Sequence, residues 1–201
     1  DLFSYSDVKY LEEVQGILYC GTENGVFLFD SNNPEREWIK YNKTNVLSNV
    51  GVSAMEYDST NDLLMIGYEN GAIDLLKEGQ SQIVLDIPWN NFTGSKAVNH
   101  IFIKDNVALI SGYFGIASYD LENREFLETT FFYQNGNYLA VNESVIYNER
   151  VYATTNNGIY SHAIVDGVNY PNFYDWQIVP NTNGLDANHV EIFNNEFYFS
   201  T

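Results

Sequence analysis

Basic residues are scarce in this sequence, which has 9 Lys and Arg against 27 Asp and Glu and a formal net charge of -18. A surface with this balance repels nucleic-acid phosphates and anionic lipid headgroups instead of neutralising them. Long apolar runs are also missing, since stretches such as 63–66 and 107–110 fall far short of the ~20 residues that span a bilayer. We therefore expect no nucleic-acid partner and no direct insertion into a membrane.

The sequence has a single cysteine, Cys20, which can form no internal disulfide and whose apolar strand pattern predicts a small buried side chain. It contains no Gly-rich phosphate loop, no Gly-x-Ser-x-Gly nucleophile motif and no dinucleotide fingerprint. The three histidines lie too far apart in the sequence to form a local metal motif, and no cysteine pair accompanies them. We therefore expect no cofactor, no bound metal and no catalytic residue.

Aromatic residues are abundant, with 16 Tyr, 13 Phe and 3 Trp among 201 residues. Disordered chains combine high net charge with few aromatics, so this chain is expected to fold in spite of its charge. Its length allows one sizeable domain with a real hydrophobic core.

Four segments share one layout, in which a strand-like stretch, a polar turn, a second apolar strand, a short Gly turn and a third strand follow one another. The Gly turns close at Gly25, Gly71, Gly115 and Gly158, which are 46, 44 and 43 residues apart. A period of ~40 to 50 residues is typical of the four-stranded blades of β-propellers. No stretch carries a sustained helical period. The sequence therefore predicts an all-β propeller of antiparallel four-stranded blades.

The repeats place blade 1 at about residues 7–42, blade 2 at about 50–87, blade 3 at about 97–133, blade 4 at about 140–180 and the start of blade 5 at about 187–201. A propeller closes by packing its last blade on its first, which about four and a half blades cannot do. We therefore expect an incomplete propeller, the opening arc of a larger one. Produced alone, such an arc should aggregate or expose apolar flanks.

Two local features bear on the loops of the expected blades. Asn-Gly closes three of the four Gly turns, which predicts two-residue hairpins whose Asn and Gly take the positive φ that the strand twist requires. The longest irregular piece, 165–175, contains Pro171 and lies between the third and fourth strands of blade 4. It is expected to protrude as a loop.

His100 and His189 occupy the same repeat position, which holds Glu143 in blade 4 and Ala54 in blade 2. If the first strand of each blade is innermost, these side chains approach the central channel. One hypothesis is a polar ligand site at the channel mouth formed by His100, Glu143 and His189; the alternative is that the ends of inner strands are merely solvated. The aromatic residues likewise either fill the space between blades or offer a platform for sugar rings.

The repeat itself, an aliphatic strand ending in Gly-Thr or Gly-Tyr and followed by Glu-Asn-Gly, resembles the two-component-regulator type of propeller repeat common in secreted proteins of Bacteroidetes bacteria. More specific are the opening residues 3–8, the run 66–74, and the segment 98–102 that leads to 115–120. Together these segments resemble the N-terminal propeller of the PorZ family, surface components of the type IX secretion system. The resemblance runs along the whole chain in the same order.

The resemblance implies two successive propellers followed by a C-terminal β-sandwich signal domain, at the outer cell surface beside a sortase. There the family helps to hand anionic lipopolysaccharide to secreted cargo. The chain would then be a non-enzymatic scaffold whose partners are other secretion proteins, such as that sortase, and possible ligands are anionic lipopolysaccharide or another glycan. It would be exported to the periplasm or outer surface of a Gram-negative bacterium of the Bacteroidetes type.

Two alternatives come from other functional classes. The same repeats form the periplasmic glycan-sensing propeller of hybrid two-component histidine kinases, which would need a membrane-spanning segment and a kinase elsewhere in the protein. A polysaccharide-degrading propeller enzyme is the other alternative. Bond cleavage that depends on an inner-strand residue such as His100 or Glu143 would favour it over the scaffold.

Overall fold

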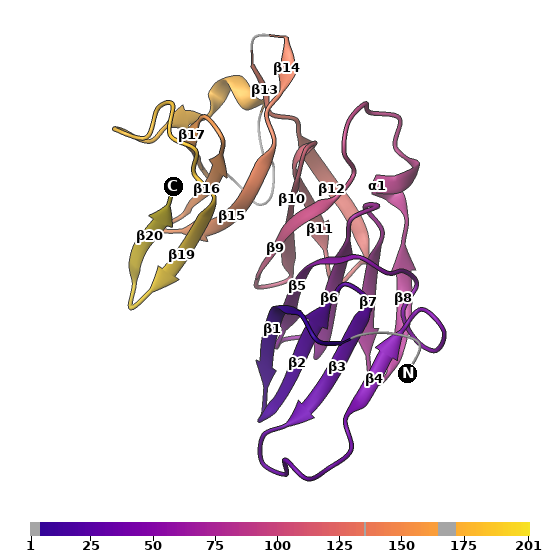
Figure 1. Cartoon of the computed structure of the whole chain (residues 1–201). Coiled ribbons are helices and arrows are strands. Elements are labelled where there is room, and N and C mark those ends of the chain that lie inside the picture. Colours follow the sequence, from indigo (N-terminus) through magenta and orange to yellow (C-terminus); the bar gives the residue numbers. More distant parts are fainter. Residues whose placement is uncertain (1–4, 135, 165–171) are drawn as a thin grey trace. The chain divides into compact units, whose positions relative to one another are not determined.

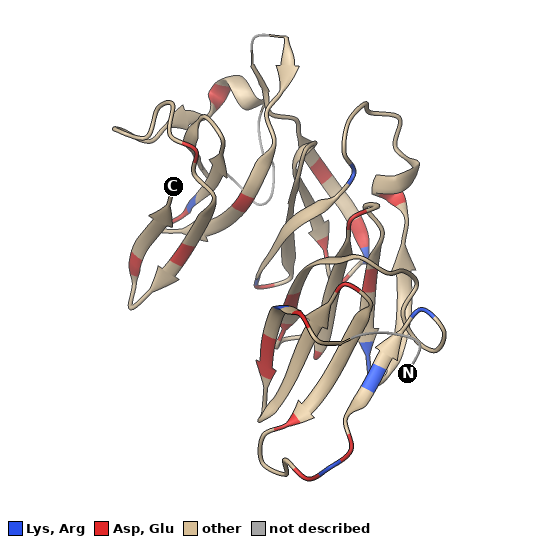
Figure 2. Cartoon of the chain, viewed as in Figure 1, with Lys and Arg blue, Asp and Glu red and all other residues tan. Residues whose placement is uncertain are grey.

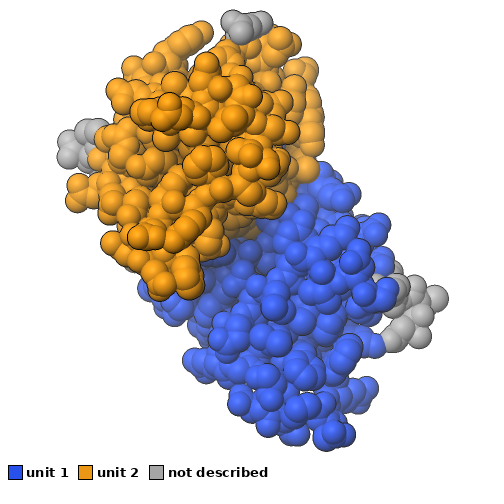
Figure 3. Space-filling view, turned by 60° about the vertical axis from the view of Figure 1, so that its left-hand side comes forward, with its two compact units in different colours: residues 1–91 blue, residues 92–201 orange. Residues whose placement is uncertain are grey.

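The computed structural model describes residues 5–134, 136–164 and 172–201 of the chain. The chain folds into two compact units, residues 1–91 and residues 92–201, which Figure 3 shows in different colours. Each four-stranded sheet is called a blade below. Unit 1 holds blades 1 and 2, and unit 2 holds blades 3 and 4 together with a two-stranded hairpin that starts blade 5.

Unit 1 consists of two antiparallel sheets whose strand order follows the sequence (Figure 1). Blade 1 has the order β1-β2-β3-β4 and blade 2 the order β5-β6-β7-β8, and the one-turn helix α1, Asp86–Trp89, comes after β8. The strands are β1 Val8–Val14, β2 Ile17–Thr22, β3 Gly25–Asp30, β4 Ile39–Asn42, β5 Val52–Asp58, β6 Leu63–Tyr68, β7 Ile73–Lys77 and β8 Gln80–Val84.

Unit 2 repeats this plan with blade 3, in the order β9-β10-β11-β12, and blade 4, in the order β15-β16-β17-β18. A small hairpin, β13-β14, lies between them in the sequence, and β19-β20 begins blade 5. The all-β fold with four-stranded antiparallel blades and an incomplete set of them agrees with the prediction. The strands are β9 Val98–Lys104, β10 Val107–Gly112, β11 Gly115–Asp120, β12 Glu125–Thr130, β13 Tyr133–Gln134, β14 Asn137–Tyr138, β15 Val141–Tyr147, β16 Arg150–Thr155, β17 Gly158–Ala163, β18 Gln177–Ile178, β19 His189–Phe193 and β20 Glu196–Ser200.

The middle strands of the blades are the most deeply buried. All six residues of β6 are buried, as are all but one in each of β10 and β11, whereas at least half of the residues of β8 and of β12 are exposed. A strand covered on both faces is apolar along its length instead of alternating, which explains the short apolar runs of the sequence. The middle strands therefore supply the core, and the fourth strand of a blade faces solvent.

Each unit has its own hydrophobic cluster, formed between its blades. The cluster of unit 1 contains Val26, Leu47, Val52, Met55, Leu64, Ile66, Tyr68, Ala72 and Leu76. That of unit 2 contains Leu109, Ile116, Phe132, Leu139, Val141, Val151, Ala153, Tyr160 and Trp176. Many aromatic rings thus pack in the core, and Cys20 is buried and free as expected.

The Gly turns form hairpins, but the prediction of their backbone conformation is wrong in one respect. Positive φ lies on the closing glycines, at 151° for Gly25, 86° for Gly71, 94° for Gly115 and 117° for Gly158, and not on the asparagine that precedes three of them. In blade 1, Thr22 pairs with Gly25, so the two loop residues come before the glycine. Gly25, Gly115 and Gly158 are the first residues of β3, β11 and β17, whereas Gly71 lies two residues before β7.

These glycines are needed for space as well as for φ. A Cβ added to Gly115 would lie 2.1 Å from the carbonyl oxygen of Thr130, and one added to Gly25 would lie 2.3 Å from that of Tyr41. In both cases the oxygen belongs to the fourth strand of the same blade. In blades 1 and 3 the glycine therefore lets the fourth strand pack against the start of the third.

The expected protruding loop of blade 4 falls mostly outside the described residues, because 165–171 are not among them. Its end is a short 3-10 helix, η1, at Phe173–Asp175. The Asn172 side chain caps this helix by accepting a hydrogen bond from the backbone N–H of Tyr174. The ring of Phe173 packs against Phe132, with ring centroids 4.6 Å apart.

Candidate functional site

The three predicted site residues lie near the start of the first strands of three successive blades in unit 2. His100 is in β9, Glu143 in β15 and His189 in β19. These first strands contact one another, β9 with β15 and β15 with β19, so the structure brings all three side chains into one cluster. Ala54, the equivalent residue of blade 2, lies in unit 1 and is buried.

Both carboxylate oxygens of Glu143 contact blade 5. Oε1 lies 2.8 Å from the Nδ1 atom of His189, and Oε2 accepts a hydrogen bond of 2.7 Å from the backbone N–H of Val190. Only 18% of the Glu143 side chain is exposed, against 75% for His189. Glu143 therefore joins the first strands of blades 4 and 5, and the His189 ring is the accessible part of the cluster.

His100 is half-buried beside Glu143, and its Nδ1 accepts a long hydrogen bond of 3.5 Å from the backbone N–H of Ser144. Burial lowers the pKa of His100 below its ordinary value; the Glu143 carboxylate acts in the opposite direction and His189 in the same one. The lowered pKa favours the neutral form of the ring. The hydroxyl of Ser111, the residue that pairs with His100 across β9 and β10, lies 2.7 Å from that of Ser144 in the core.

A second contact between blades comes from asparagines just before these residues. In each complete blade the register of the first strand shifts at this position, which is a β-bulge. The Asn99 amide donates to the carbonyl of Val141 at 2.8 Å, and the Asn142 amide donates to that of Ala187 at 2.9 Å. The bulge thus turns one amide toward the next blade.

The cluster therefore forms a row of polar contacts between the first strands of neighbouring blades. A ligand would reach these residues through the exposed His189 ring, and ligand binding by the cluster stays a prediction. Within residues 5–134, 136–164 and 172–201, no group of three or more His, Cys, Asp or Glu side chains could hold a metal ion. The same residues contain no helix that is long and apolar enough to cross a membrane.

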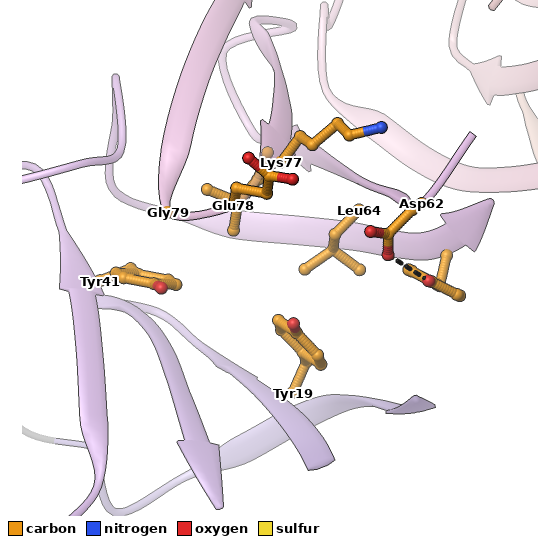
Figure 4. Close-up of a pocket in the computed structure, with 9 residues that line it drawn as sticks. Tyr19, Tyr41, Asp62, Leu64, Lys77, Glu78 and Gly79 are labelled. Carbon is orange, nitrogen blue, oxygen red and sulfur yellow. Dashed lines mark hydrogen bonds between the residues drawn. The ribbon is translucent and has the colours of Figure 1, made fainter. Parts of the chain in front are cut away.

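Sequence reasoning missed a pocket of about 150 Å³ between the two blades of unit 1 (Figure 4). Blade 1 contributes Tyr19 from β2 and Tyr41 from β4. Blade 2 contributes the apolar floor, the acidic groups and a third tyrosine, with lining residues Tyr57, Asp62, Leu64, Leu76, Lys77, Glu78 and Gly79. We call it the tyrosine pocket.

Hydrogen bonding within the tyrosine pocket is partly fixed. The Tyr57 hydroxyl donates to Oδ1 of Asp62 at 2.6 Å, and this bond raises the pKa of Tyr57 to about 12. Burial, followed by the proximity of Tyr41 and Asp62, raises the pKa of Tyr19. The Lys77 ammonium donates to the carbonyl of Asn61 at 2.7 Å.

The sequence carried no clear signal for this pocket. Tyr19 stands six residues before the closing glycine, a position that holds Met65 in blade 2, Leu109 in blade 3 and a second tyrosine, Tyr152, in blade 4. The other lining residues come from separate strands and turns, and no local motif connects them.

Unit 2 has a second, more open cleft of about 480 Å³ beside the β13-β14 hairpin. Among the described residues, three tyrosines and no charged residue line it, namely Thr93, Gly94, Tyr113, Tyr133, Gly136, Asn137 and Tyr138. The ring of Tyr138 lies 5.9 Å from that of Tyr113 and 5.5 Å from that of Tyr133, measured between centroids. This arrangement offers aromatic faces to solvent.

Comparison with solved structures identifies relatives of the fold. The PorZ surface component of the type IX secretion system of Porphyromonas gingivalis matches with a TM-score of 0.78 and 19% identity over 96% of this chain. The extracellular domains of two putative hybrid two-component systems of B. thetaiotaomicron match with TM-scores of 0.76 and 0.69 and identities of 14% and 15%, over 96% and 97% of this chain. The chain spans only 25% to 26% of these proteins, and likeness at this identity shows the fold.

The sequence of the chain matches no curated protein. It does match the family model described as "TSS9, PorZ, N-terminal beta-propeller domain" over residues 18–177. This match covers most of the chain, from β2 to the start of β18, and confirms the resemblance found in the repeats. The chain therefore belongs to the family of N-terminal β-propeller domains of PorZ.

Proposed function

We propose that this chain is part of an exported, non-enzymatic scaffold that docks other proteins of a type IX secretion apparatus, including a surface sortase, at the cell surface. The observation that carries the proposal is membership of the PorZ propeller family over residues 18–177. The structural relative from P. gingivalis, described as an essential surface component of that system, supports it. The role in handing anionic lipopolysaccharide to cargo is part of the same proposal.

The charge of the chain favours protein partners with basic surfaces. Acidic residues are spread over strands and turns of both units, and basic residues are few (Figure 2). A field of one sign raises the encounter rate with molecules of opposite charge and disfavours anionic ones. Any contact of the propeller with anionic lipopolysaccharide would therefore be local, or would pass through another part of the protein.

The proposal is tested by deleting the coding sequence in its host and measuring how much type IX cargo reaches the cell surface. We expect surface-attached cargo to be lost and to return when the intact gene is supplied. Unchanged cargo display in the deletion strain would contradict the proposal. Cleavage of a glycan by the purified protein, abolished by changing His100 or Glu143, would instead support the enzyme alternative.

A glycan-contacting role is a second candidate, favoured by the uncharged, tyrosine-lined cleft beside the β13-β14 hairpin. Aromatic faces stack on sugar rings, and the cleft falls in the ~300–1,000 Å³ range of ligand pockets. The structural likeness to extracellular domains of two-component systems fits a sensor with the same role. Titration with neutral and anionic oligosaccharides tests it: we expect neutral sugars to bind and Tyr133→Ala to weaken them, and no binding of either kind would contradict it.

A further inference from the structure

The tyrosine pocket has a lining that nothing in the blade repeat requires. Tyr19 and Tyr41 approach the hollow from blade 1, and Leu64 and Glu78 face them from blade 2 (Figure 4). All three lining tyrosines are half-buried, so their rings form the walls while part of each remains accessible. The same three tyrosines also pack against the hydrophobic cluster of unit 1, so each ring has one side in the core and another on the hollow.

The charges at the rim of the pocket are mainly negative. Asp62 and Glu78 are exposed carboxylates on the blade 2 side, and Lys77, the one cation among the described lining residues, donates to the carbonyl of Asn61, which leaves the rim with two negative charges against one positive. Asp62 is held in place by the hydroxyl of Tyr57, which uses one of its two oxygens. The pocket thus combines aromatic walls with carboxylates at its opening, inside a chain whose net charge is -18.

This combination matches the chemistry of a guanidinium group. A planar guanidinium stacks on aromatic faces and donates paired hydrogen bonds to carboxylates, whereas an ammonium is a compact and more strongly hydrated charge. A volume of about 150 Å³ suits the end of one long side chain, since pockets for drug-sized ligands are ~300–1,000 Å³. An anionic ligand would meet the Asp62 and Glu78 carboxylates and be repelled.

We propose that the tyrosine pocket receives an arginine side chain of a basic partner protein, with the guanidinium between the tyrosine rings and its N–H groups directed to Glu78 and Asp62. This inference rests on the proposed docking function and locates one contact of it in unit 1. Arginine and tyrosine are both enriched among the residues that dominate protein interfaces. The pocket would anchor one residue of a larger interface.

The test uses saturation-transfer NMR on the full protein, with the peptide acetyl-Gly-Arg-Gly-amide as the probe. The same peptide with citrulline in place of arginine is its neutral isostere, and methyl glucoside is the sugar probe. We expect the arginine peptide to bind in the millimolar range, as one anchored side chain does, and the citrulline peptide to bind at least about tenfold more weakly. Raising the salt concentration should weaken the binding of the arginine peptide, because salt screens the charge of the exposed carboxylates.

Two variants separate the pocket from the general acidity of the chain. Glu78→Gln keeps the shape of the side chain and removes one charge at the rim, and it should lower the affinity for the arginine peptide about tenfold. Glu37→Gln removes an exposed carboxylate in a loop of blade 1 outside the pocket, and it should change the affinity less than about twofold. Tyr19→Phe removes a hydroxyl, keeps the ring face, and should preserve most of the binding.

Three results would overturn the inference: equal binding of the citrulline peptide, binding of methyl glucoside in preference to the arginine peptide, or no effect of Glu78→Gln. Each of these results could occur even if the protein is needed for secretion. If instead the proposed docking function is wrong, the deletion strain will display cargo normally. The two failures are therefore distinguishable.

Discussion

Replacing Gly115 by alanine tests the reason why the glycine recurs in every blade. Gly115 has a φ of 94°, and a Cβ there would lie 2.1 Å from the Thr130 carbonyl oxygen and 2.9 Å from the Phe132 backbone nitrogen. Both atoms belong to backbone, so a flexible side chain cannot relieve the contact. The fourth strand, β12, would have to move away from β11.

The expected loss of stability has two parts. An L-residue in this left-handed region costs roughly 1–2 kcal/mol, and forced displacement of a packed backbone costs typically about 1–3 kcal/mol more. Gly184→Ala is the matched control, because Gly184 has a φ of 77° and nothing lies within 4 Å of its added Cβ. The control should show the first part alone, so Gly115→Ala should be the more damaging by about 1–3 kcal/mol.

Native-state hydrogen exchange of the protein measures this difference locally, by the rate at which the β10 and β11 amides open. A difference of 1.4 kcal/mol corresponds to a factor of ten in rate. Relative to wild type, the acceleration of β11 amide exchange in Gly115→Ala should therefore be about 5 to about 140 times the acceleration near residue 184 in the control. Equal effects of the two substitutions would refute the argument. The glycine would then serve only its φ angle, and the close approach of β12 would be unimportant.

Three further results are expected. Asn142→Ala removes the amide that donates to the Ala187 carbonyl, and it should destabilise the start of β19 by about 1 kcal/mol in hydrogen exchange, whereas unchanged protection there would contradict an inter-blade bond. Thr155→Val removes the hydroxyl that donates to the carbonyl of the closing glycine and should speed exchange in the β16-β17 hairpin about fivefold; no change would mean that the bond is not needed. The pKa of Tyr57 is raised to about 12, so the stability that this phenol supplies is present below pH ~10 and is lost as the pH rises through 10 to 12. Ultraviolet titration should show that the pKa of Tyr57 returns toward 10 in Asp62→Asn. A Tyr57 that already ionises near pH 10 in the wild type would contradict the hydrogen bond.

The blades could be predicted from the sequence because each is a local structure. Adjacent strands joined by short turns pair with each other, and the glycines such as Gly25 and Gly115 mark the same turn in each copy. Apolar runs such as 63–66 became strands buried on both faces, for the same reason that they looked continuous in the sequence. The arrangement of strands within a blade follows from such short-range information.

Contacts between blades were less predictable because they depend on register and on bulges. The repeat position correctly grouped His100, Glu143 and His189, yet their sequence alone gave no sign that Glu143 binds the backbone of Val190 with one carboxylate oxygen. The asparagine amides reach the next blade only because a bulge turns them there. The positive φ was assigned to Asn as well as Gly because the sequence does not show which residue pairs across the hairpin.

The tyrosine pocket was even harder to predict from the sequence than the contacts between first strands. Its lining comes from five strands of two blades, and Tyr19 and Tyr41 become neighbours of Glu78 only when those blades pack. In the sequence these residues are indistinguishable from the many other tyrosines that fill the core. A site of this kind is built by tertiary packing, and local patterns do not record it.

A crystal or cryo-electron microscopy structure of the protein tests the central claim most directly, because it shows how successive blades meet. The account predicts that β9, β15 and β19 lie next to one another as first strands, with the Asn142 amide within hydrogen-bond distance of the Ala187 carbonyl, as in the 2.9 Å contact described above. Sheets joined edge to edge, with the fourth strand of one paired to the first strand of the next, would contradict it.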